Sequence, residues 1–191
     1  MGYALYETAL REREPFSWRT LLLLVMLANL PDIDFLPGLL AGNPNQYHHH
    51  YFSHSLPFAL VVGAVLAGHV SIKKGKKFWP YFLLFAGVCF SHVILDYFSA
   101  DTSEPLGVPM FWPLSNEYYY SPVLIFMSVN KSSSSATFFQ SLLVMHNLWV
   151  ALWEVVVFVP VLTIIKMVKM RKRALNMSLR ATEGSEAISD I

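Results

Sequence analysis

The chain contains little charge and almost no cysteine. Only 14% of its 191 residues are Asp, Glu, Lys or Arg, and the net charge at pH 7 is +1. Because the basic residues form only short clusters and no continuous stripe, nucleic-acid binding is not expected. Cys89 is the single cysteine, so an intramolecular disulfide is excluded and the redox compartment cannot be read from cysteine usage.

Apolar residues make up 54% of the chain, and they gather in four stretches, which are residues 21–30, 56–72, 78–98 and 142–168. A membrane-spanning helix needs about 20 apolar residues, with a lower limit of roughly 17. The last three stretches satisfy this length and the first is marginal. We therefore expect an all-α fold, a polytopic membrane helical bundle of about four segments. Residues 1–175 would form one membrane-embedded domain and residues 176–191 a polar C-terminal tail.

The distribution of basic residues predicts the orientation of this bundle. Lysine and arginine are absent between Arg19 and Lys73, four lysines then cluster in residues 73–77, and basic residues return in residues 166–173. By the positive-inside rule, the 73–77 turn and the C-terminus lie in the cytoplasm. The start of the second segment and the end of the third would then lie at the outer face.

Histidine and aspartate gather at these outer ends. His92 and Asp96 are four residues apart, which places them on one face of the third segment if it is helical. An imidazole and a carboxylate beside lipid are costly unless something neutralises them, and a divalent metal does so. The other cluster is Pro31-Asp-Ile-Asp34 followed by His48-His-His50 and His54. The sequence therefore predicts a metal site at the outer face.

Each part of this cluster also has a structural interpretation. Asp32 and Asp34 are typical of a helix cap and a turn. The histidine run is compatible with a loop that only titrates. His92 and Asp96 could form a hydrogen-bonded pair that joins two helices. The convergence of all three on one membrane face favours the metal site.

The types of candidate ligand indicate the metal and the chemistry. Neutral imidazoles and carboxylates suit zinc, manganese or iron, and the absence of cysteine ligands argues against a structural zinc site. More than four candidate ligands suggest two metals, which suits phosphoester hydrolysis by metal-activated water. Three serines are candidates for hydrogen bonds to the ligands, namely Ser53, Ser55 and Ser91. Residues 101–131, rich in aromatics and proline, are expected to form a lid or an interfacial belt.

The ordered motifs resemble the YdjM-type, LexA-regulated inner-membrane proteins, which are described as metal-dependent hydrolases. The resemblance covers about residues 2–130, and its motifs are Leu30-Pro-Asp-Ile-Asp34, His49-x4-His54-Ser55, Ser91-His-Val-Ile-Leu-Asp96 and Gly107 through Phe111-Trp-Pro-Leu-Ser115. This family is similar to the zinc-dependent phospholipase C and P1-nuclease group.

The resemblance implies a metal site and a role for its residues. The implied metal ligands are Asp32, Asp34, His49, His54, His92 and Asp96. His54 and Asp96 would also be catalytic, the metal would be zinc, with manganese or iron as alternatives, and the substrate would be a phosphoester. The location of the site at the membrane surface, apart from the resemblance, suggests a membrane lipid or a lipid-like molecule as that substrate. Which of His48, His49 and His50 is the ligand stays open.

The chain departs from the family pattern at three places. His50 and Ser53 stand where relatives usually carry an arginine-like residue and a threonine. Family members also carry a histidine near the start of the first helix, whereas this chain has none before His48. Either Met1 is an internal start and the ligand was lost with the missing residues, or the site has one ligand fewer; we expect the former.

Three alternatives to a hydrolase remain. The same ligands could serve a non-enzymatic metal-binding or transport protein, although a transporter should carry polar groups through the membrane and here only His69 and Glu154 depart from the clustering. The chain could be an inactive, N-terminally truncated copy. The His–Asp pairs could also be purely structural, in which case no metal would copurify. Oligomeric state is not indicated.

Overall fold

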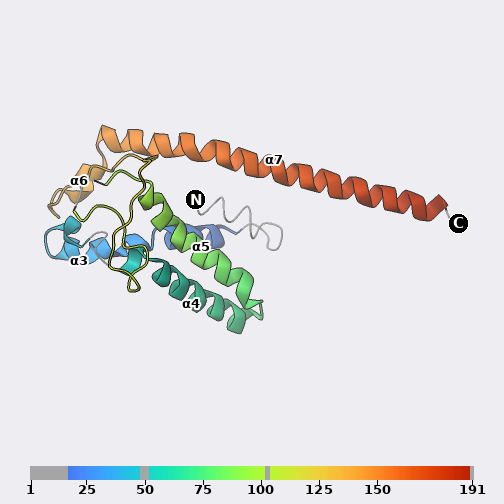
Figure 1. The fold of residues 1–191 in the computed structure, drawn as a ribbon, viewed down its shortest axis with the longest axis horizontal. Helices are drawn as coiled ribbons and strands as arrows, with labels where there is room; N and C mark the ends of the chain where they lie inside the picture. Colours follow the sequence, from blue (N-terminus) through green and yellow to red (C-terminus); the bar gives the residue numbers. More distant parts are fainter. Residues whose placement is uncertain (1–16, 48–51, 102–103, 190–191) are drawn as a thin grey trace. The chain divides into compact units, whose positions relative to one another are not determined.

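The computed structural model describes residues 17–47, 52–101 and 104–189, and over these residues the chain is helical without a regular strand (Figure 1). The α-helices are α2 (Trp18–Ala28), α3 (Phe35–Leu40), α4 (Leu56–Lys74), α5 (Phe78–Tyr97), α6 (Phe138–Leu142) and α7 (Met145–Ser189). Three short 3-10 turns lie between α2 and α4, namely η1 (Pro31–Asp34), η2 (Pro44–Gln46) and η3 (Phe52–His54). The chain divides after Trp153 into two compact units, and the site belongs to the first.

Within the part of the chain that the structure describes, three helices are long and apolar enough to cross a membrane, namely α4, α5 and the Met145–Arg171 part of α7. The pair formed by α2 and the residues Pro31–Leu40, bent by 55°, is a fourth candidate. Large apolar side chains such as Val65 and Leu83 remain exposed on the helix surfaces, which suits hydrocarbon rather than water. The expected helical membrane fold is confirmed, and α7 continues to Ser189, beyond the end expected from the apolar run.

Helices α4 and α5 form an antiparallel hairpin whose contact face carries small residues. Ala59, Gly63 and Ala67 recur every four residues along α4, and all three are buried. A Cβ atom at Gly63 would lie 2.7 Å from Ala86 Cβ and closer than 3.0 Å to its backbone, so the helices approach too closely for a larger residue. Small residues permit such close approach of membrane helices.

The turn between the two helices contains the lysine cluster. Gly75 ends α4 in the left-handed conformation, with φ of 61°, which glycine adopts without steric cost. At 1.5 Å per residue, the 19 residues of α4 extend about 28 Å, close to the thickness of the hydrocarbon core. The start of α4 and the end of α5 therefore lie together, about one membrane thickness from the lysines.

The long connection between α5 and α6 is fastened to that same end of the hairpin. The Leu56 amide at the start of α4 donates a hydrogen bond to the Met110 carbonyl (2.8 Å), and the Ser121 amide donates to the carbonyl of Tyr97, the last residue of α5 (2.8 Å). This connection is held against the hairpin end that carries the histidines and aspartates.

Candidate metal centre

The two aspartates of the first cluster lie in the turn that follows α2. Pro31 begins η1, where its fixed φ and missing amide proton suit the first position of a helical turn. Pro31 and the Asp34 side chain are buried, whereas Asp32 retains 32% side-chain exposure. The bend at this turn therefore brings two carboxylates to the end of the bundle.

His54 is fixed in place by the start of α4. The next residue, Ser55, caps this helix, because its Oγ accepts a hydrogen bond from the Phe58 amide (3.3 Å) and donates one to the Phe52 carbonyl (2.6 Å). Pro57 occupies the first turn, where proline is well tolerated. As a result, the His54 side chain is fully buried directly before the helix.

His92 and Asp96 come from the last two turns of α5. His92 Nε2 lies 3.3 Å from Asp96 Oδ2, the contact expected from residues four apart on a helix. Both side chains are mostly buried, with 15% and 18% exposure. The sequence prediction that these two residues share a face is confirmed.

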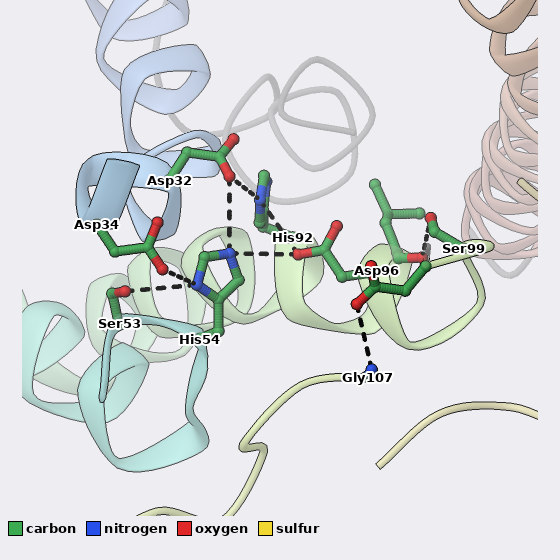
Figure 2. A network of polar contacts seen from close by, with 10 residues as sticks. Asp32, Asp34, Ser53, His54, His92, Asp96, Ser99 and Gly107 are labelled. Atoms are coloured by element: carbon green, nitrogen blue, oxygen red, sulfur yellow. Dashed lines mark hydrogen bonds and ion pairs between the residues drawn. The ribbon is translucent and has the colours of Figure 1, made fainter. Parts of the chain in front are cut away.

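These groups converge on one point (Figure 2). His54 Nε2 lies 3.6 Å from Asp32 Oδ1 and 3.5 Å from Asp96 Oδ2, and His92 Nε2 lies 3.2 Å from Asp32 Oδ1. On the opposite side of the imidazole, His54 Nδ1 lies 3.0 Å from Asp34 Oδ2. Two imidazole nitrogens and two carboxylate oxygens thus face one another. Asp34 contacts the other ring nitrogen of His54, on the side away from these atoms.

Asp32, His54 and His92 are spaced as ligands of one metal ion could be, and Asp96 lies outside this group of three. Ligand atoms about 2.0–2.2 Å from a tetrahedral metal are separated from one another by about 3.3–3.6 Å. The ion-pair distances within the cluster are 3.2, 3.3, 3.5 and 3.6 Å. One ligand atom each from Asp32, His54 and His92 also lies within 4.8 Å of the others. Among the described residues, the buried His92 Nε2 has no hydrogen bond of good geometry, as expected of an atom placed to bind a metal.

The local charge favours a cation at this position. Burial alone would lower the pKa of His54, but its contacts with Asp32 and Asp34 and the charge of Asp96 raise that pKa to about 10. Without a metal, the imidazole of His54 is therefore protonated at neutral pH. A proton and a divalent metal would compete for the same position, because an imidazole must be neutral to bind a metal.

Five of the six ligands implied by the family resemblance meet here. They are Asp32, Asp34, His54, His92 and Asp96. The sixth, His49, lies outside the described residues, as do His48 and His50. Their role as ligands stays a prediction.

The three serines have different environments. Ser53 Oγ lies 3.4 Å from His54 Nδ1, consistent with the expected hydrogen bond to a ligand. Ser55 acts instead as the cap of α4. Ser91 donates to the Val88 carbonyl within its own helix (2.7 Å), so the expected contact to the ligands was wrong for this residue.

Two residues of the connection were missed by the sequence prediction. Asp101 Oδ2 accepts a hydrogen bond from the Gly107 amide (3.2 Å), where φ is +92° and an added Cβ would meet Tyr119 O at 2.5 Å. Lys131 interacts electrostatically with the carboxylates of the site. One feature of the sequence could have identified Lys131: it is the single lysine or arginine between Lys77 and Lys166.

Membrane-spanning helices with a His–Asp cluster at one end of the bundle define a polytopic membrane protein with a possible metal-binding group. The chain belongs to the YdjM inner membrane protein family, whose model matches residues 1–173. It is also 34% identical to the inner membrane protein YbcI of Escherichia coli (strain K12) over 104 residues, which are 51% of this chain and 56% of that protein. The chain thus spans about half the length of this curated relative. No solved structure matches the chain. The expected family is confirmed, while the relation to the phospholipase C and P1-nuclease group stays a prediction.

Proposed function

We propose that this protein is an integral membrane, metal-dependent hydrolase that acts on a phosphoester. The observation that carries the proposal is that one ligand atom each from Asp32, His54 and His92, in η1, η3 and α5, lies within 4.8 Å of the others, and that Asp96 Oδ2 lies 3.5 and 3.3 Å from the two imidazole Nε2 atoms. Imidazole and carboxylate ligands favour zinc, with manganese or iron as alternatives. A divalent metal bound there would supply Lewis acidity and lower the pKa of a water molecule.

The residues divide into ligands and a group that orients one of them. Asp32, His54, His92 and Asp96 face the centre of the cluster and would hold the metal. Asp34 contacts the other nitrogen of His54, so it would accept the Nδ1 proton and keep Nε2 directed at the metal. With its carboxylate oxygen near both imidazole Nε2 atoms, Asp96 would also lie beside any water at the site.

The surroundings of the site support a membrane lipid as the substrate. A groove of about 370 Å³ runs between α2 and α4, lined by apolar side chains that include Leu27, Leu30 and Val65. Leu30, which lines the groove, is two residues before Asp32 in the sequence. An acyl chain in this groove would bring the phosphoester of its headgroup to the metal ligands.

Metal content is the first test. Protein purified in detergent should contain stoichiometric zinc, manganese or iron by inductively coupled plasma mass spectrometry. The metal should disappear in the His92→Ala/Asp96→Ala variant and remain in a matched control, His69→Ala/Glu117→Ala, whose two side chains are exposed and are not among the residues of the site. Metal-free wild-type protein after supplementation would contradict the proposal and leave the His–Asp pairs with a structural role.

Hydrolysis is the second test. Metal-loaded protein should release a phosphorylated or dephosphorylated headgroup from phospholipids in mixed micelles, and the His92→Ala/Asp96→Ala variant should not. Stoichiometric metal without turnover of any phosphoester would instead support a non-enzymatic metal-binding protein.

A further inference from the structure

Lys131 lies in a segment that is held firmly on both sides. The Asn130 amide donates to Asn147 Oδ1 (2.7 Å), and Asn147 Nδ2 donates back to the Asn130 carbonyl (2.7 Å). On the other side, the Ser132 amide donates to Ser141 Oγ (2.7 Å). The backbone at Lys131 is therefore fixed by the start of α7 and by α6, although Lys131 is in a connection without regular structure.

This segment passes between the two elements that carry the carboxylates. Upstream, the Ala100 amide donates to the Phe126 carbonyl (3.0 Å), which ties the segment to the end of α5. Downstream, Ser135 donates to the carbonyls of Gly42 (3.1 Å) and Leu39 (2.6 Å), at the end of α3. Helix α3 continues directly from the turn that carries Asp32 and Asp34. The segment that contains Lys131 is thus tied at one end to the end of α5 and at the other to the end of α3, the two helices next to the aspartates of the site.

The Lys131 side chain is half-buried and is within electrostatic range of four carboxylates, which are those of Asp101, Asp32, Asp96 and Asp34. It nevertheless forms no ion pair with any carboxylate among the residues that the structure describes. A partly desolvated ammonium is costly unless an anion contacts it. An anion that contacted the Lys131 ammonium would lower this cost.

The charges of the site indicate when such an anion could bind. Asp32 and Asp96 together carry two negative charges, which a divalent metal would cancel. The pair of Asp34 and His54 adds a negative charge once the imidazole is neutral and binds the metal. Asp101 adds a further negative charge near Lys131, so Lys131 offsets part of the remaining negative charge and is the cation that this connection offers to an anion.

We propose that Lys131 forms an anion subsite beside the metal ligands and binds the non-bridging oxygens of a phosphate group. This inference rests on the proposed function and names the phosphate-binding residue of that same site. A single ammonium contacts phosphate as a point charge, and an arginine can replace it in part, whereas a neutral amide cannot.

The test measures zinc and inorganic phosphate separately by isothermal titration calorimetry of the full chain in detergent. Lys131→Gln should weaken phosphate binding to the zinc-loaded protein by about tenfold or more, and Lys131→Arg should retain most of it. Zinc affinity in Lys131→Gln should be unchanged or higher, because the variant loses a positive charge near the metal. The control is Lys74→Gln, an exposed cation at the opposite end of α4, which should change neither affinity.

The outcomes separate this inference from the proposed function. Failure of the wild-type protein to bind zinc would contradict the metal-dependent function. Phosphate binding that is absent in the wild type, or equal in wild type and Lys131→Gln, would overturn the subsite. A loss of zinc and phosphate binding together in Lys131→Gln would also overturn it, because that pattern indicates a structural role.

A second arm distinguishes the source of the phosphate. Phosphatidate in mixed micelles should displace inorganic phosphate from the zinc-loaded wild type if the subsite takes a lipid headgroup, with phosphatidylcholine as the lipid control. If inorganic phosphate binds in a Lys131-dependent manner and phosphatidate does not displace it, the ligand is free phosphate.

Discussion

Asp32 and Asp34 are separated by one residue, yet they contact opposite nitrogens of the same imidazole. Asp32 lies on the Nε2 side of His54, with the other candidate ligands, and Asp34 lies on the Nδ1 side. The short 3-10 turn produces this division, because it directs the two carboxylates to different sides of His54. At the scale of single residues, the two aspartates are therefore expected to have different roles.

Asp34→Asn should weaken metal binding by about 10- to 100-fold without abolishing it, the range typical of a lost partner of a metal ligand. The amide keeps the volume of the side chain but not the charge that orients His54. Asp32→Ala should abolish stoichiometric binding, because it removes the ligand oxygen. Titration with zinc in detergent measures both affinities, and equal losses in the two variants would contradict this division of roles.

The charge of His54 predicts how the metal-free protein responds to pH. Its pKa is about 10 in the folded protein, above the ordinary value of 6.5. A raised pKa contributes stability that is fully present below about pH 6.5 and is lost as pH rises through 10. The melting temperature of metal-free protein should therefore fall between pH 7 and pH 10. His54→Gln should show a smaller decrease, and an equal decrease in both proteins would exclude His54 as its source.

At the scale of elements, the close approach of α4 and α5 provides a direct test of the hairpin. Gly63→Ala should destabilise the protein by about 1–3 kcal/mol, because the new Cβ would meet Ala86 at 2.7 Å. Gly68→Ala on the same helix is the matched control, since a Cβ there has nothing within 4 Å. Thermal unfolding in detergent should show a decrease for the first variant and no decrease for the second.

The groove between α2 and α4 provides a second test at this scale. Val65→Trp should fill it and reduce hydrolysis of long-chain phospholipids more than that of short-chain ones, because only the longer acyl chain needs the groove. Leu83→Trp, an exposed position on α5 outside the groove, controls for the added bulk. An equal effect on both chain lengths would contradict an acyl-chain role for the groove.

The sequence predicted the elements and the ligand candidates to different extents. The second and third apolar runs match α4 and α5 within two residues, because uninterrupted apolar residues and the Gly75 turn specify them locally. The pairing of His92 with Asp96 was also predictable, because helical spacing alone determines it. The contact of Asp34 with the far nitrogen of His54 was not, since it depends on how η1 packs against η3. Lys131 is even less predictable, because it reaches the cluster through a long irregular connection.

At the scale of the whole molecule, the lysine turn and the His–Asp cluster lie at opposite ends of the α4–α5 hairpin. If the positive-inside rule holds, the cluster faces outward and the C-terminus is cytoplasmic.

Cysteine labelling tests this orientation. In a Cys89→Ser background, E117C should react with a membrane-impermeant maleimide in intact cells. K74C should react only after the membrane is disrupted, and the reverse pattern would place the cluster inside. Both positions are exposed, so accessibility of the side chain does not limit labelling.

The start of α7 is bound to the connection that carries Lys131. Trp153 Nε1 donates to the Ile125 carbonyl (2.8 Å), and His146 Nε2 donates to the Ser128 carbonyl (2.9 Å). These contacts join a candidate membrane-spanning helix to the backbone beside the ligand cluster. Spanning helices respond to bilayer thickness by tilting. A tilt of α7 would pull on this connection, so we expect the thickness of the surrounding membrane to affect the geometry of the His–Asp cluster.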